Sequence, residues 1–150
     1  MALKVSTMLP LGKPLPHFTL PDVRTGQVIS PGLYAQKEAF LVMFICRHCP
    51  YVIHVQEELG KLGRDYQHKS VGIVAISSND VNNYPQDSPI RLKEMAEELH
   101  FLFPYCYDET QMVAKMFTAA CTPDFFLFNG ERKLCIVDSW TIADRGTENL

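Results

Sequence analysis

Residues 39–52 read Ala-Phe-Leu-Val-Met-Phe-Ile-Cys-Arg-His-Cys-Pro-Tyr-Val. The run from Ala39 to Ile45 is continuously apolar, which is typical of a central strand that is covered on both faces. From Tyr51 to about Tyr66, apolar residues recur at helical spacing between charged ones, so a helix is expected there. Cys46 and Cys49 therefore form a Cys-x-x-Cys pair between a buried strand and the start of a helix.

The rest of the chain alternates between strand-like and helix-like segments. The pattern predicts an N-terminal hairpin over residues 17–29, strands at 71–76, 124–128 and 132–137, helices at 90–99 and at 109–119 with Asp108 as N-cap, and a short apolar segment at 101–103. Such alternation predicts a single α/β domain over residues 1–150, with helices on both faces of a central sheet. Residues 78–89 form a long polar loop, and loops of that length are often functional.

The composition fits one globular domain. The 150 residues are 47% hydrophobic and 21% charged, and 14 Lys+Arg against 17 Asp+Glu give a net charge of −3. This balance provides no basic field for a nucleic-acid partner. The first residues lack the pattern of a secretory signal, and the longest apolar run, 39–46, is far too short to span a bilayer. We therefore expect a cytoplasmic protein with no nucleic-acid and no membrane partner.

The Cys-x-x-Cys pair is the strongest functional signal. Five cysteines, an odd number, do not suggest a structural disulfide framework in a cytosolic chain. At a helix N-terminus the unpaired N–H groups and the helix dipole favour a thiolate, and Arg47 and His48 add positive charge beside it. We expect a lowered pKa at Cys46, predicted to be the more exposed cysteine. Cys46 would attack a disulfide sulfur and Cys49 would resolve the mixed disulfide.

A zinc site is the alternative use of the pair. Cys-x-x-Cys is half of a zinc knuckle, and the residues that could complete it are His48, His54, Cys106 or Cys121. No second Cys-x-x-Cys and no His-x-x-x-His follows, so we expect neither a metal nor another cofactor.

A second signal is Cys121-Thr122-Pro123, directly before the strand at 124–128. In combination with the Cys-x-x-Cys pair, Pro123 is predicted to be a cis-proline at the mouth of this strand. Cys121 is a candidate accessory thiol near the pair. The alternative, a buried unreactive side chain, is the commoner state of a free cysteine and is favoured.

Together these motifs resemble a group of cytosolic thioredoxin-like proteins in the alkyl hydroperoxide reductase/thiol-specific antioxidant (AhpC/TSA, peroxiredoxin-like) superfamily. The similar segments are the strand–Cys-x-x-Cys–helix unit, residues 78–80, 84–89 and 103–105, and the Thr-Pro–strand unit, within residues 11–134. The resemblance implies a thioredoxin-like fold with a central mixed sheet and an N-terminal β-hairpin extension.

The resemblance also implies roles for individual residues. Cys46 is the attacking thiol, Cys49 the resolving thiol, and Pro123 the cis-proline that faces them. A cis-proline there leaves the backbone of Thr122 free to hold an extended substrate strand.

Two departures from these relatives affect the chemistry. Thioredoxin carries a buried acid on the strand before the motif, but residues 40–45 are wholly apolar, so only water or His48 is left as proton acceptor for Cys49. Peroxiredoxins carry a Pro-x-x-x-Thr-x-x-Cys pattern. Here Met43 lies three before Cys46, and Cys46 lies three before Cys49, so the peroxide-activating hydroxyl is missing.

Three functions remain open at this stage. The leading hypothesis is a thiol–disulfide oxidoreductase that cycles a Cys46–Cys49 dithiol and redox-active disulfide, with a protein or small-molecule disulfide as substrate and an external thiol as reductant. The alternatives are an antioxidant thiol peroxidase that acts on hydroperoxides and a non-catalytic thioredoxin-like binding module.

Residues 135–150 do not continue the resemblance. They show no amphipathic period and leave no room for a three-turn helix, so we expect the closing helix of the fold to be missing. Codons compatible with this stretch, read in a shifted frame, give residues similar to the family tail. A frameshifted tail is our hypothesis, and a genuinely divergent terminus is the alternative. An uncovered sheet face usually finds a partner, so we expect a homodimer through it.

Overall fold

The computed structural model describes residues 10–119 and 122–139. Its elements, in chain order, are β1 (Leu20–Pro21), β2 (Val28–Ile29), η2 (Pro31–Tyr34), β3 (Ala39–Phe44), α1 (Pro50–Asp65), β4 (Val71–Ser77), η3 (Pro85–Asp87), α2 (Pro89–Glu98), β5 (Tyr105–Tyr107), α3 (Met112–Phe117), β6 (Asp124–Phe128) and β7 (Leu134–Ser139). Within the described ranges, no helix is both long and apolar enough to cross a membrane. The predictions for Cys121 and for residues 140–150 lie outside these ranges.

Five strands form one mixed sheet in the order β5-β4-β3-β6-β7. β3 pairs parallel with β4 and antiparallel with β6, while β4–β5 is parallel and β6–β7 is antiparallel. β1 and β2 form a separate antiparallel pair, which confirms the N-terminal hairpin. The central position of β3 explains its apolar sequence, because both of its edges are paired and both of its faces are covered.

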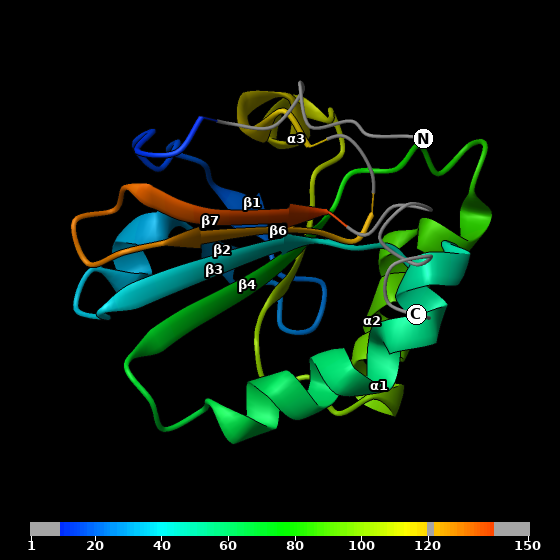
Figure 1. The fold of residues 1–150 in the computed structure, drawn as a ribbon. Coiled ribbons are helices and arrows are strands. Elements are labelled where there is room, and N and C mark those ends of the chain that lie inside the picture. Colours follow the sequence, from blue (N-terminus) through cyan, green and yellow to red (C-terminus); the bar gives the residue numbers. More distant parts are fainter. Residues whose placement is uncertain (1–9, 120–121, 140–150) are drawn as a thin grey trace, which may run out of the picture.

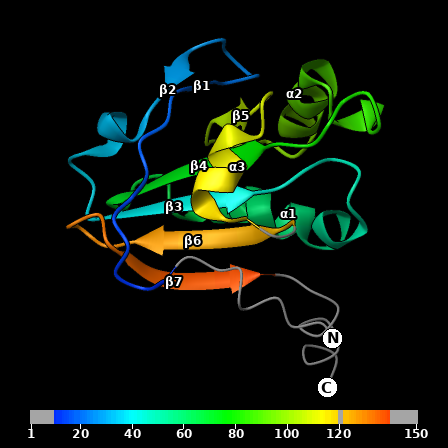
Figure 2. The same cartoon turned by 90° about the horizontal axis from the view of Figure 1, so that it is seen from above.

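The two faces of the sheet carry separate halves of the core. Phe40 and Phe44 of β3 pack with Phe117 of α3, whereas Met43 packs with residues of α1 and α2. Figures 1 and 2 show α3 and α1 on opposite sides of the sheet. This alternation along β3 follows from the two-residue period of a strand. It confirms the prediction of helices on both faces.

The same topology brings three loops to one edge of the sheet. Because β3 and β4 are parallel neighbours, their carboxyl ends lie side by side, and antiparallel β6 begins at that edge. Phe44 at the end of β3 accordingly lies opposite both Ile76 and Asp124. The loops after β3, after β4 and before β6 therefore converge.

The bounds of α3 and β7 differ from the predictions by two residues or more. α3 is shorter than 109–119, and its cap position is taken by Gln111 in the left-handed region (φ 65°). The side chain of Asp108 instead accepts hydrogen bonds from the Ala114 N–H (3.0 Å) and the Ser78 hydroxyl (2.7 Å). Strand β7 starts two residues later than predicted, because the turn after β6 extends through Arg132, which also has a positive φ (62°).

Helix α1 approaches the segment after α2 closely at Gly60. A Cβ at this position would lie 2.5 Å from the backbone carbonyl oxygen of Leu99. We expect Gly60→Ala to destabilise the fold, because overpacking against backbone costs about 1–3 kcal/mol. That cost exceeds the gain in helix propensity of roughly 1 kcal/mol. Urea unfolding measures the change. Gly32→Ala is the matched control, since its Cβ would meet only Ser30 Oγ, at 3.9 Å, and an equal effect of both variants would contradict the expectation.

Candidate active site

The Cys-x-x-Cys loop joins β3 to α1. Cys46 is fully buried, whereas Cys49 is partly exposed and is the N-cap residue of α1, with Pro50 in the first turn. The prediction that Cys46 is the more exposed thiol is therefore wrong. The reason is that the backbone of β3 keeps pairing past its last residue: the N–H of Ile45 donates to the carbonyl of Ile76 at 2.9 Å. Cys46 consequently stays in the core layer between the sheet and α1.

Thr122 contacts both cysteines. The Sγ of Cys46 lies 3.4 Å from the Thr122 hydroxyl, and the Cys49 thiol donates to the Thr122 carbonyl at 3.3 Å. The peptide bond between Thr122 and Pro123 is cis, as predicted. The structure thus brings Cys46, Cys49, Thr122 and Pro123 to one edge of the sheet.

The two thiols differ in acidity. A hydrogen bond from the Cys46 thiol lowers the pKa of Cys49 to about 5, assisted by the Thr122 hydroxyl and the backbone N–H groups of Val52 and Tyr51. The same hydrogen bond, followed by burial, raises the pKa of Cys46 well above its usual range. The lowered pKa was predicted for Cys46. In the structure Cys49 and not Cys46 stands at the helix N-terminus, so the geometry favours the thiolate at Cys49 instead.

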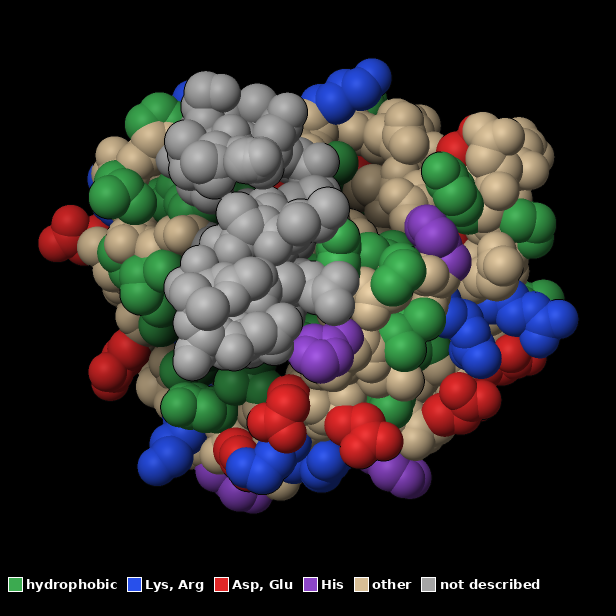
Figure 3. Space-filling view, turned by 45° about the vertical axis from the view of Figure 1, so that its right-hand side comes forward, with side chains coloured by type: hydrophobic (Ala, Val, Ile, Leu, Met, Phe, Trp, Pro, Cys, Tyr) green, Lys and Arg blue, Asp and Glu red, His purple; other side chains and the backbone are tan. Residues whose placement is uncertain are grey.

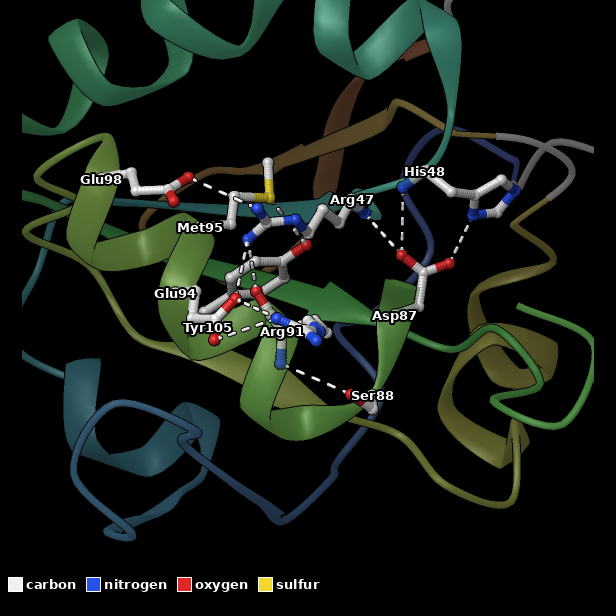
Figure 4. A network of polar contacts seen from close by, with 9 residues as sticks. All are labelled: Arg47, His48, Asp87, Ser88, Arg91, Glu94, Met95, Glu98 and Tyr105. Carbon is white, nitrogen blue, oxygen red and sulfur yellow. Dashed lines mark hydrogen bonds and ion pairs between the residues drawn. The ribbon is translucent and has the colours of Figure 1, made fainter. Parts of the chain in front are cut away.

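Asp87 lies beneath this loop and is fully buried. One of its carboxylate oxygens accepts the backbone N–H groups of Arg47 (2.6 Å) and His48 (3.2 Å). The other oxygen accepts the Asn79 amide (2.9 Å) and is paired with Nδ1 of His48. Figure 4 shows Asp87 reaching from η3 to both the backbone of the loop and the His48 ring. Asp87 therefore fixes the conformation of the Cys-x-x-Cys loop.

His48 and Arg47 were predicted to supply positive charge beside Cys46. In the structure their side chains point in different directions. His48 pairs with Asp87, and its ring stacks on Tyr84 with centroids 4.2 Å apart. The Arg47 guanidinium turns to α2, where it donates to the carbonyl of Arg91 (2.8 Å) and lies 3.5 Å from Glu98 (Figure 4). The contacts that lower the pKa of Cys49 most come instead from Cys46, Thr122 and the backbone of α1.

Sequence reasoning did not single out Asp87 and Asn79, although both lie in the polar loop identified as a candidate. Their position follows from the parallel pairing of β3 and β4, which places the loop after β4 beside the loop after β3. The available signal was an acidic residue next to Ser88-Pro89, where α2 begins. Alone it does not distinguish a site residue from a helix cap.

Two further cysteines within the described residues are separate from the pair. Cys106 is buried in the core on the α3 side, and burial raises its pKa to about 12, so it is an unreactive core residue. Cys135 is exposed on β7.

A metal would find three potential ligands here. Cys46, His48 and Asp87 each offer one ligand atom, and these atoms lie within 4.8 Å of one another. Of the candidates for completing a zinc site that the structure describes, which are His48, His54 and Cys106, His48 is in this group. Both carboxylate oxygens of Asp87 already accept N–H donors, so a cation would have to displace them.

A comparison with protein-family models matches residues 11–140 to the AhpC/TSA family. The chain belongs to the AhpC/TSA family. The match extends past residue 134, where the resemblance in the sequence was taken to end. A search of curated proteins found no match.

Solved structures of similar chains support a thioredoxin-like fold for this AhpC/TSA-family protein. An uncharacterized conserved protein from Geobacillus kaustophilus is 49% identical, with a TM-score of 0.85 over 90% of this chain and 71% of that chain. A hypothetical protein from Sinorhizobium meliloti 1021 is 36% identical, with a TM-score of 0.84 over 89% and 74%. A putative thiol:disulfide interchange protein from Chlorobium tepidum shares the fold at 16% identity, with a TM-score of 0.72 over 94% of each chain.

The acidity of Cys49 can be measured by its alkylation rate. With a pKa of about 5, the thiolate fraction rises as pH increases through 5 and is already constant at neutral pH. Cys46→Ala removes the largest stabilising hydrogen bond, so the midpoint of the rate profile should move to higher pH. Iodoacetamide labelling mapped by mass spectrometry gives both profiles. A wild-type profile that rises first at Cys46 would contradict the assignment.

Proposed function

We propose that this AhpC/TSA-family protein is a thiol–disulfide oxidoreductase in which Cys49 attacks the substrate and Cys46 resolves the mixed disulfide. The observation that carries the proposal is the position of Cys49, a partly exposed N-cap thiol with a lowered pKa, hydrogen-bonded to a buried second thiol. This order reverses the one expected from the sequence.

The cycle transfers two electrons from the dithiol to the substrate. The Cys49 thiolate attacks one sulfur of a substrate disulfide, forms a mixed disulfide and releases the first substrate thiolate, which takes up a proton. Cys46 then loses its proton and attacks Cys49 Sγ. The enzyme disulfide forms and the second substrate thiol leaves. An external dithiol returns the pair to its reduced state.

The surroundings of Cys49 suit a polypeptide substrate. Ile53, whose N–H bonds to the Cys49 carbonyl, and Tyr84, which stacks on His48, are 50% and 43% exposed. Figure 3 shows hydrophobic side chains gathered among charged ones on one face of the molecule. Ionisation of Cys49 removes its hydrogen bond to the Thr122 carbonyl, which then accepts an N–H from an extended substrate strand.

A thiol peroxidase is the second candidate, favoured by the family match and by the Thr122 hydroxyl beside the thiols. In that reaction the Cys49 thiolate would attack a peroxide oxygen, giving a sulfenic acid and an alcohol. Condensation with the Cys46 thiol would then release water. We rank it second because the peroxiredoxin pattern has a threonine hydroxyl three residues before the attacking cysteine. Here that position is Cys46, which has no hydroxyl.

Trapping experiments distinguish the roles of the two cysteines. The wild type should accelerate insulin reduction by dithiothreitol, and both Cys49→Ser and Cys46→Ser should abolish this activity. Cys46→Ser should still attack and accumulate a mixed disulfide on Cys49, which mass spectrometry detects, whereas Cys49→Ser should accumulate none. Cys135→Ser, which removes an exposed thiol on β7, is the matched control and should behave as wild type.

The opposite result, a mixed disulfide on Cys46 in the Cys49→Ser variant, would reverse the assigned roles. Rapid consumption of hydroperoxide by a wild type that does not reduce insulin would favour the peroxidase instead.

A further inference from the structure

Resolution by Cys46, as in the proposed function, requires a group that accepts its proton. Cys46 is fully buried, and its thiol is engaged with Cys49 and Thr122. Strand β3, which leads to the motif, is apolar throughout and contributes no acid or base. The proton acceptor must therefore come from a neighbouring segment.

His48 and Asp87 occupy the required place. A ring nitrogen of His48 and a carboxylate oxygen of Asp87 lie within 4.8 Å of Cys46 Sγ and of each other. This separation from Cys46 Sγ is too long for direct proton transfer but leaves room for one bridging water molecule to carry the proton. Among the described residues, they are the groups that form such a cluster with a cysteine.

The contacts of Asp87 prepare His48 for this task. An ionised carboxylate only accepts hydrogen bonds, so Nδ1 of His48 carries the proton in their pair and Nε2 is left as the basic nitrogen. The loop N–H groups and the Asn79 amide hold the carboxylate in a fixed orientation. Stacking on Tyr84 holds the imidazole plane.

We propose that His48 accepts the proton of Cys46 during resolution and that Asp87 is the positioning residue that orients His48; this assignment rests on the proposed function. As Cys46 Sγ attacks Cys49 Sγ, its proton moves to the imidazole and the mixed disulfide breaks. The imidazolium, paired with Asp87, then returns the proton to the departing substrate thiolate. Protons and electrons balance within the site.

The other ionisable groups around the pair do not compete for this role. Tyr105 of β5 is fully buried, and burial raises the pKa of its phenol well above the usual range. Arg47 faces Glu98 and Glu94 of α2. Tyr84 contacts the ring through its face, and Cys49 is the thiol under attack.

Dithiobis(nitrobenzoate) separates the two chemical steps. Attack by Cys49 releases one coloured thiolate, and resolution by Cys46 releases a second. Since this leaving group needs no proton, the second release reports deprotonation and attack by Cys46 alone. Stopped-flow absorbance measures both phases in a Cys135→Ser background, because the exposed Cys135 would release a further equivalent. The Asp87→Asn and His48→Ala variants are compared with this background, and Glu97→Gln and His68→Ala serve as controls at exposed positions.

We expect the second phase to slow by about 10²-fold or more in His48→Ala, the usual contribution of a general base, and by at least about tenfold in Asp87→Asn. In both variants its rate should become first order in hydroxide, whereas the rate of the Cys135→Ser background levels off with pH. Added imidazole should restore the second phase in His48→Ala. The control variants should match this background in both phases.

The outcomes distinguish this assignment from the function on which it rests. A Cys135→Ser background that releases only one equivalent would refute the dithiol cycle itself. Two normal equivalents with an unchanged second phase in both variants would overturn only the role of His48 and Asp87. A second phase that is slowed by the same factor at every pH, and that added imidazole does not restore, would also overturn the role of His48 and Asp87. One equivalent of bound zinc that is lost in Asp87→Asn would assign the cluster to metal binding instead.

Discussion

The pairing of β3 between parallel β4 and antiparallel β6 is the constraint on which the site depends. It places the carboxyl ends of β3 and β4 and the start of β6 along one edge of the sheet. Cys49, Asp87 and Thr122, which are far apart in sequence, meet there as a consequence. No local propensity could bring them together, because each belongs to a different loop.

The proposed roles of the two cysteines follow from where β3 ends and α1 begins. The backbone bond from Ile45 to Ile76 keeps Cys46 in the core layer, and α1 starts at Pro50, so Cys49 receives the helix N-terminus. The proposed assignment therefore departs from the order of the cysteines in the motif. What stabilises a thiolate is proximity to unpaired N–H groups at the helix end, and that depends on the loop length between strand and helix.

The sequence predicted those features that depend on local patterns. Strand β6 has the predicted bounds, and β3 and α1 deviate by a single residue at one or both ends, since apolar runs and helical periodicity are strong over these lengths. The side-chain partners were not predictable in this way. Asp87 acts on a loop forty residues earlier in the chain, and Arg47 is drawn to acidic residues of α2. Both contacts are set by tertiary packing.

Uncharged hydrogen-bond donors lower the pKa of Cys49, whereas the sequence led us to expect that the charges of Arg47 and His48 would lower the pKa of Cys46. The hydrogen bond between the two thiols couples the two halves of the proposed cycle. The bond from the Cys46 thiol is the largest stabiliser of the Cys49 thiolate and the largest cause of the raised pKa of Cys46. When Cys49 enters a mixed disulfide, its negative charge disappears. The Cys46 thiol then loses the acceptor that held its proton. Attack at Cys49 therefore makes Cys46 easier to deprotonate, so the resolving thiol is released for reaction only after there is a mixed disulfide to resolve.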